Sequence, residues 1–152
     1  RRRVTEKEKM TAERRAQSKG VMTLTVPSHP KFLYVIRSAL YPVIVDSGFS
    51  KKDARKIILA VDEACSNIIK YAYEGDPAKS ITLVVTADAG RIAIQLKDIG
   101  KKTDPSKIAP RKLEDVRPGG LGTHFMGAVF DTVQYDTEQD QGTVLTLVKE
   151  KR

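Results

Sequence analysis

The chain has no tryptophan, one cysteine and two histidines among its 152 residues. A single cysteine, Cys65, cannot form a disulfide within the chain, which favours a reducing compartment. The longest apolar stretch, residues 33–45, contains Arg37 and Ser38 and is shorter than the roughly 20 residues that a membrane-spanning helix needs. The first residues also lack the charged and then apolar pattern of a signal peptide. We therefore expect a cytoplasmic protein.

The composition that remains is that of a globular domain, with 40% hydrophobic and 30% charged residues. The net charge is +8, and residues 1–20 alone carry eight basic and three acidic side chains. Such an arm can bind phosphate backbones nonspecifically, but it has no interleaved aromatic residues and is more typical of a solvated linker or helix. We expect a basic arm or linker over 1–20, which could end a linker from a longer polypeptide, and one domain over 21–152.

The first part of the domain predicts a strand and then a helix. Apolar and polar residues alternate over 21–26, as in a half-buried strand. Apolar residues then recur at helical spacing from about residue 30 to Gly48, with Ser28 as a candidate cap. Pro42 lies within this helix and is expected to kink or divide it.

The clearest helix signal begins after Ser50, where an apolar stripe runs for about six turns until the Gly75–Pro77 stop. A β-hairpin follows over 81–96, with its turn at 88–90. Residues 99–120 are rich in proline, glycine and charge, and we interpret them as a long loop that acts as a lid.

The last part of the chain predicts a short helix over 121–130, a strand over 132–136, a turn at 140–142 and a final strand through Val144 and Leu147. Strands and helices in this order indicate an α+β fold. We expect a two-layer α/β sandwich, in which helices cover one face of a mixed, mostly antiparallel sheet.

Glu63 and Asn67 are the first candidate site residues. They lie four apart on the clearest helix, so both side chains project from one face. A carboxylate beside an amide oxygen suits a hard divalent cation, or a general base beside a metal ligand. The alternative for such a pair is an ordinary solvated helix face.

Two further segments have the composition of a ligand site. Asp98-Ile99-Gly100 ends a predicted strand, where an aspartate can accept hydrogen bonds from a buried amine and a glycine lets a ligand approach the backbone. Residues 117–123 form a glycine-rich turn that leads into a helix, and the free amides of such a turn can bind phosphate. Taken alone, the second segment could equally be a flexible loop with a glycine stop.

Together these segments resemble a known family. Four motifs follow one another along the chain: Glu63-Ala-Cys-Ser-Asn67, Asp98-Ile-Gly100, Gly120-Leu-Gly122 and Gly142-Thr143. Their order is similar to that of the GHKL-type ATPases and kinases, and within them to that of the bacterial anti-sigma-factor serine kinases. The resemblance covers residues 22–149. It implies the Bergerat-type ATP-binding fold, with ATP and Mg²⁺ as cofactors.

The resemblance also implies roles for individual residues. Asn67 would hold Mg²⁺, Glu63 would be the general base that takes a proton from an attacking serine, and Arg117 would meet the γ-phosphate. Asp98 would read the adenine amino group. The other implied nucleotide-binding residues are Gly100, Gly120, Gly122 and Thr143. Positioning and charge neutralisation are what phosphoryl transfer chiefly requires.

The chain departs from the family pattern in places. Lys101 and Lys102 follow Asp-x-Gly, where many relatives have a glycine or an apolar residue. Tyr71 stands where many relatives have a histidine, and Thr123 where an apolar residue is common. None of these changes removes an implied ligand. Cys65 lies on the apolar stripe and is expected in the core rather than as a nucleophile.

The resemblance predicts a serine protein kinase. We do not expect a histidine autokinase, because residues 1–20 contain no histidine, and we do not expect a relative that couples ATP hydrolysis to a transducer domain. We expect Mg-ATP-dependent phosphorylation of a serine on an anti-sigma-factor antagonist, with partner-switching control of a sigma factor. A homodimer through the first strand and helix is also implied. The alternatives are an ATP-gated binding module without phosphotransfer and, with less support, a basic nucleic-acid-binding domain.

Overall fold

The computed structural model describes residues 2–17, 19–101, 120–138 and 140–152, with the side chains of 14–17 and 120–124 left out of the description. The helical elements of the described part are α1 (Glu6–Gln17), the 3₁₀ turn η1 (Pro30–Phe32), α2 (Leu33–Asp46), α3 (Lys51–Asn67), the π-helical turn η2 (Ile68–Ala72) and α4 (Gly120–Val129). The strands are β1 (Gly20–Pro27), β2 (Ser80–Asp88), β3 (Arg91–Asp98), β4 (Thr132–Asp136) and β5 (Thr143–Glu150).

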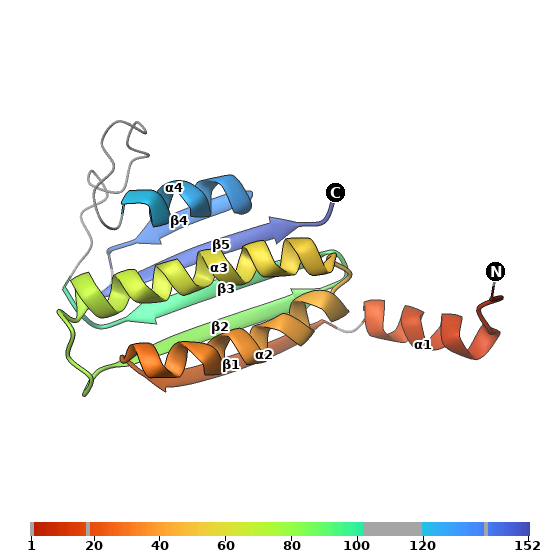
Figure 1. Cartoon of the computed structure of the whole chain (residues 1–152), viewed down its shortest axis with the longest axis horizontal. Helices are drawn as coiled ribbons and strands as arrows, with labels where there is room; N and C mark the ends of the chain where they lie inside the picture. Colours follow the sequence, from red (N-terminus) through yellow and green to blue (C-terminus); the bar gives the residue numbers. More distant parts are fainter. Residues whose placement is uncertain (1, 18, 102–119, 139) are drawn as a thin grey trace.

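The strands form one five-stranded sheet in the order β1-β2-β3-β5-β4, and every neighbouring pair is antiparallel. Helices α2, α3 and α4 cover one face of it (Figure 1). In the described part of the chain no helix covers the opposite face. The expected two-layer α+β sandwich is therefore confirmed, with a described sheet that is antiparallel throughout.

The alternation predicted from the sequence places one row of side chains under the helices. Leu24, Leu83, Leu96, Leu145 and Tyr135 stand opposite one another across the five strands. The three central leucines of this row are at most 5% exposed. Burial of a leucine stabilises the fold by about 1.5–3 kcal/mol, so this row is a main source of stability for the sandwich.

The start of the second helix differs from the prediction. His29, not Ser28, caps the 3₁₀ turn, because its Nδ1 accepts a hydrogen bond from the amide of Lys31 at 3.1 Å. Ser28 is 1% exposed, and its Oγ has no hydrogen-bond partner among the described residues. Pro42 lies inside α2, which runs through it without a break. Of the two expected effects, a kink or a division, the division was wrong, because a long apolar face holds the helix against the core.

The third helix begins as predicted, since the Ser50 side chain accepts a hydrogen bond from the amide of Asp53 at 3.1 Å. Its α-helical part ends at Asn67, earlier than the apolar stripe predicts. The chain then makes one π-helical turn, in which the amide of Tyr73 bonds the carbonyl of Ile68 at 3.0 Å. π-turns of this kind are rare and frequently lie at functional sites.

The remaining elements follow the prediction closely. The hairpin turn lies between Asp88 and Arg91, and the last helix and both final strands are present within a few residues of the expected ends. Residues 102–119, which include most of the predicted lid, lie outside the described residues. The lid therefore stays a prediction.

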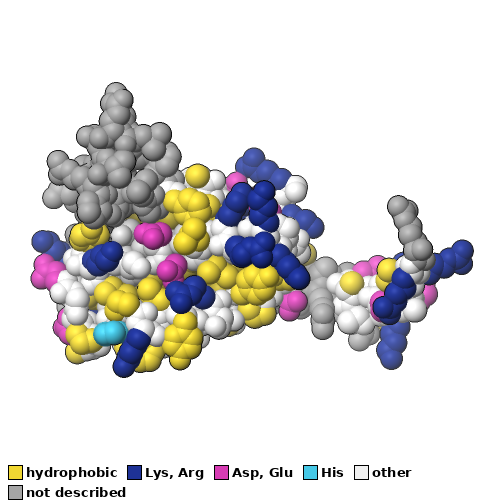
Figure 2. Space-filling model, viewed as in Figure 1, with side chains coloured by type: hydrophobic (Ala, Val, Ile, Leu, Met, Phe, Trp, Pro, Cys, Tyr) yellow, Lys and Arg dark blue, Asp and Glu magenta, His cyan; other side chains and the backbone are white. Residues whose placement is uncertain are grey.

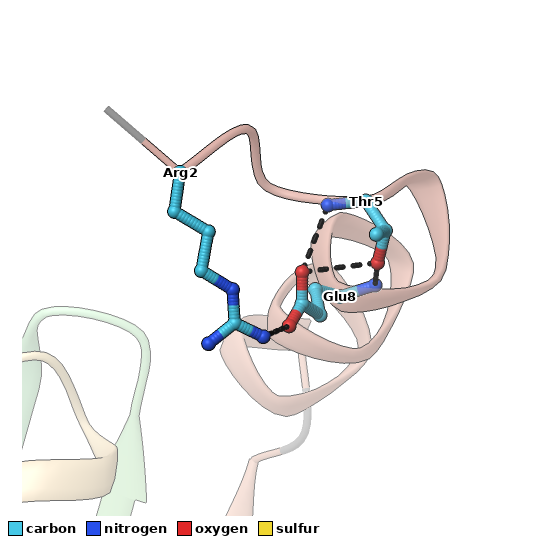
Figure 3. A network of polar contacts seen from close by, with 3 residues as sticks. All are labelled: Arg2, Thr5 and Glu8. Carbon is cyan, nitrogen blue, oxygen red and sulfur yellow. Dashed lines mark hydrogen bonds and ion pairs between the residues drawn. The ribbon is translucent and has the colours of Figure 1, made fainter.

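Part of the basic arm is the helix α1, which extends beyond the edge of the sandwich (Figure 1). Thr5 and Glu8 form a capping box: the amide of Glu8 bonds Thr5 Oγ1 at 3.2 Å, and the amide of Thr5 bonds Glu8 Oε2 at 2.8 Å (Figure 3). Arg2 pairs with the other Glu8 oxygen at 3.1 Å. The hydrogen bonds from the amide and the hydroxyl of Thr5 lower the pKa of Glu8. No helix among the described residues has the length and apolar character to cross a membrane.

Candidate functional site

Four segments that carry predicted site residues meet at one end of the sandwich (Figure 1). They are the C-terminal part of α3, the end of β3, the start of β5 and the start of α4. Antiparallel pairing of β3 with β5 brings the second and third of these segments together. The fold thus gathers at one place residues that are up to 80 positions apart in the sequence, from Glu63 to Thr143.

Glu63 and Asn67 lie on α3 with half-buried side chains, whereas Ala64 and Cys65 between them are buried in the core. The two polar groups therefore share the side of the helix that faces away from the core. No cluster of three or more metal-ligating side chains occurs in the described ranges. The pair of Glu63 and Asn67 nevertheless fits Mg²⁺, because proteins typically hold this ion through one or two side chains together with substrate phosphates.

Asp98 is a buried carboxylate at the end of β3, with 7% of the residue exposed. Its Oδ1 accepts a hydrogen bond from the amide of Gly100 at 3.0 Å, and the amide of Thr143 also bonds the carboxylate. Burial raises the pKa of Asp98, and the two amide hydrogen bonds oppose this shift. A buried acceptor of this kind can bind the amino group of a heterocyclic base.

Thr143 is the register partner of Asp98 and is 2% exposed. The structure therefore places the two predicted base-binding residues side by side. The turn before Thr143 ends at Gly142, whose φ of +74° is in the left-handed region. A Cβ at Gly142 would collide with the carbonyl oxygen of Asp98.

Gly100 has a packing role that the sequence does not predict. A Cβ at this position would collide with the carbonyl oxygen of Ala72 and would lie 2.8 Å from Cδ1 of Tyr73. The amide of the next residue, Lys101, bonds the same Ala72 carbonyl at 2.8 Å. The absence of a side chain at Gly100 thus lets the end of β3 pack directly on the π-turn after α3.

Gly120 and Gly122 lie in the first turn of α4, as expected for a glycine-rich helix start. The first amides of a helix have no partner within it, and the helix dipole makes this end attractive to anions. Arg117, the predicted partner of the γ-phosphate, lies outside the described residues. Among the described residues, the candidate phosphate-binding groups are therefore the backbone amides at the start of α4.

The main exposed basic cluster of α3 lies at the other end of that helix from Asn67 (Figure 2). It consists of the side chains of the first two turns, Lys51, Lys52, Arg55 and Lys56. The positive charge of these turns therefore does not serve the predicted phosphate-binding end.

Tyr73 is a site residue that sequence reasoning missed. It is 5% exposed, its hydroxyl donates a hydrogen bond to the carbonyl of Ser80 at 2.6 Å, and the same hydroxyl accepts one from the amide of Ile99 at 2.9 Å. An aromatic residue two positions before Gly75, where the predicted helix stops, was the available signal. Its inward position depends on the π-turn, which no sequence pattern marks.

These features define a class of protein. The sheet is antiparallel and covered by helices on one face, and the candidate site combines an asparagine on the central helix, a buried aspartate at a strand end and a glycine-rich helix start. This is the arrangement of histidine-kinase-like ATP-binding domains. Residues 26–149 match the family model described as the histidine kinase-like ATPase domain. The chain belongs to this family.

Relatives of known sequence are similar over most of the chain. The serine-protein kinase RsbW of Halalkalibacterium halodurans is 26% identical over 143 residues, which cover 89% of this chain and 86% of the relative. The protein of the same name from Bacillus cereus is 27% identical over 134 residues, covering 83% and 82% of the two chains.

Solved structures share the fold. The RsbU and RsbW domains of a Mycobacterium tuberculosis protein superpose with a TM-score of 0.61 at 16% identity, covering 88% of this chain and 33% of that chain. A histidine kinase domain from the blue-light-activated histidine kinase of Erythrobacter litoralis has a TM-score of 0.53 at 15% identity, covering 82% and 61%. At these identities the likeness concerns the fold alone.

Proposed function

We propose that the protein is a serine protein kinase that transfers the γ-phosphate of ATP to a serine of a small protein; its relatives are named serine-protein kinase RsbW. The observation that carries the proposal is the buried carboxylate of Asp98 beside Thr143, at the end of the sandwich where α3 presents Glu63 and Asn67. This arrangement offers a base-binding acceptor at one position and a carboxylate with an amide oxygen at another.

Each proposed residue has a chemical task. Asp98 accepts a hydrogen bond from the adenine amino group, and Thr143 lies beside it. Gly120 and Gly122 leave room for the nucleotide, and the first amides of α4 bind its phosphates. Gly100 contributes by letting the segment after Asp98 pack on the π-turn. Asn67 supplies the protein oxygen for Mg²⁺, which when bound neutralises phosphate charge.

Glu63 is the proposed general base. A carboxylate one helical turn from the metal-binding amide can accept the proton of a serine hydroxyl as that oxygen attacks the γ-phosphorus. Arg117 is proposed to stabilise the charge on the transferred phosphoryl group. Most of the catalysis is then positioning and electrostatic stabilisation rather than covalent chemistry.

The proposed acceptor is an anti-sigma-factor antagonist, with a sigma factor as a second partner that is bound or released in partner switching. This part of the proposal goes beyond the name of the relatives and rests on the resemblance of the site motifs. A cytoplasmic location and a homodimer belong to the same proposal.

The test is transfer of label from γ-labelled ATP to a candidate antagonist protein in magnesium buffer. The Glu63→Gln variant should lose transfer by about 10²–10⁴-fold while it retains nucleotide affinity. Asp53→Asn is the matched control, because Asp53 lies on the same helix at its first turn. Transfer by Glu63→Gln at the wild-type rate would show that Glu63 is not the base. Nucleotide binding without any transfer by the wild type would instead favour an ATP-gated binding module.

A further inference from the structure

We infer that Tyr73 is a positioning residue for nucleotide binding, which holds the Asp98–Gly100 segment in place from the π-turn after α3. The inference rests on the proposed function, because it assigns to Asp98 the recognition of adenine. Tyr73 itself is buried and acts through the backbone that it holds.

The hydroxyl of Tyr73 joins two separate segments of backbone. It accepts a hydrogen bond from the amide of Ile99 at 2.9 Å and donates one to the carbonyl of Ser80 at 2.6 Å. Ile99 directly follows Asp98, and Ser80 is the first residue of β2. Without the hydroxyl, the amide of Ile99 would lose the partner that fixes its direction.

Ala72, the residue before Tyr73, makes a second contact with the segment that follows Asp98. The carbonyl of Ala72 accepts a hydrogen bond from the amide of Lys101 at 2.8 Å. Consecutive residues of the π-turn thus bond the amides on either side of Gly100. Gly100 itself packs so closely on Ala72 and Tyr73 that no Cβ fits.

The π-turn explains why Tyr73 faces inward. The amides of Tyr73 and Gly75 bond the carbonyls of Ile68 and Ile69 at 3.0 and 2.8 Å, five and six residues back. An α-helical continuation would bond four residues back and would rotate the ring to another face of the helix. The turn begins directly after Asn67, so it connects the proposed magnesium ligand to the proposed adenine-binding segment.

The surroundings of Tyr73 keep its hydroxyl protonated. Burial raises the pKa of Tyr73, and the negative charge of Asp98 acts in the same direction, against the hydrogen bond from Ile99. The hydroxyl therefore retains the proton that it donates to Ser80 throughout the neutral pH range.

The test compares Tyr73→Phe with Tyr135→Phe. Tyr135 is a half-buried residue of β4 whose hydroxyl forms no hydrogen bond with the described residues in the structure. Dissociation constants of ATP and ADP are measured by calorimetry in magnesium buffer, at a temperature well below both melting midpoints. Amide hydrogen exchange of Ile99 and Lys101 is followed in the same proteins without nucleotide.

We expect Tyr73→Phe to bind ATP and ADP about five- to tenfold more weakly, equally for both because the adenine end is affected. Exchange at Ile99 should accelerate, and the phosphate transfer rate at saturating ATP should stay within about twofold of the wild type. Tyr135→Phe should keep the wild-type affinity. Tyr73→Leu, which also lacks the hydroxyl, should bind ATP and ADP no more tightly than Tyr73→Phe does.

Wild-type affinity in Tyr73→Phe, or an equal loss in both variants, would overturn the inference. A wild-type exchange rate at Ile99 in Tyr73→Phe would overturn it as well, even if the affinity fell. A wild type that binds ATP but transfers no phosphate would refute the proposed kinase activity and leave the role of Tyr73 intact. Failure of the wild type to bind either nucleotide would refute both.

Discussion

Gly142 lies directly against the carbonyl oxygen of Asp98, with no space for a side chain between them. Its backbone also has a φ of +74°, which an L-residue with a side chain rarely adopts. Two independent constraints therefore require glycine at the turn that leads into β5. The turn in this way supports the buried aspartate of the candidate site.

We predict that Gly142→Ala lowers the free energy of unfolding by about 2–4 kcal/mol, since it combines an unfavourable φ with a backbone collision. Urea unfolding followed by circular dichroism measures the effect. Gly127→Ala is the control, because Gly127 is exposed in α4 and a Cβ there meets nothing within 4 Å. That variant should be more stable than the wild type by about 0.5–1 kcal/mol. A Gly142→Ala protein as stable as the wild type would contradict the packing described.

Two buried serines should respond to alanine in opposite directions. Ser28 Oγ has no partner among the described residues, so Ser28→Ala should raise the free energy of unfolding by about 0.5–2 kcal/mol. The Ser47 hydroxyl donates to the carbonyl of Val43 at 2.8 Å, so Ser47→Ala should lower it by about 0.5–1.5 kcal/mol. Denaturant titration of both variants measures the difference, and a loss of stability in Ser28→Ala would show that its hydroxyl is satisfied.

Asp98 should make the fold less stable as pH rises, because burial raises its pKa above the ordinary value of 3.8. The folded state then holds the proton more tightly, so this stabilising contribution is complete below the unfolded pKa and is lost as pH rises through the folded pKa. We therefore expect Asp98→Asn to gain stability relative to the wild type from pH 3.5 to 7.

The same variant, Asp98→Asn, should lose the increase in melting temperature that ATP produces in the wild type.

Asp131 provides the control with the opposite sign. The hydrogen bond from the amide of Glu150, at 2.8 Å, is the main cause that lowers the pKa of Asp131. Its contribution is present above the unfolded pKa and is lost as pH falls through the folded pKa. Asp131→Asn should therefore lose stability relative to the wild type as pH rises towards the ordinary carboxyl value of 3.8, and should keep that deficit at higher pH. Parallel pH profiles for the two variants would be inconsistent with these assignments.

Cys65 should be inert in the native protein. The residue is fully buried, and burial raises the pKa of its thiol, with the nearby charge of Asp62 acting in the same direction. Since the thiolate is the reactive form, labelling with a disulfide reagent should require unfolding. We expect one thiol to react promptly in urea and to react slowly without it. Rapid labelling of the folded protein would place Cys65 at the surface.

Much of the fold could be predicted from local patterns. The alternation in the strands, the Ser50 cap and the turn between β2 and β3 are properties of short segments, and the structure contains all three. Two features of the second helix differ from the local prediction. His29 caps the 3₁₀ turn through a hydrogen bond from the amide of Lys31, and α2 runs through Pro42 because its apolar face is buried against the core. The roles of the candidate site residues stay predictions.

The sequence by itself determined the residue types of the candidate site and their order, since Glu63, Asn67, Asp98 and Thr143 are recognisable from motif and spacing. Only the tertiary structure decided what holds them together. The packing of Gly100 on Ala72, and the hydrogen bond from the amide of Lys101 to the carbonyl of Ala72, join backbone segments that are far apart in the chain. Such contacts follow from the way the sheet and helices close on a shared core, and a local pattern carries no information about them.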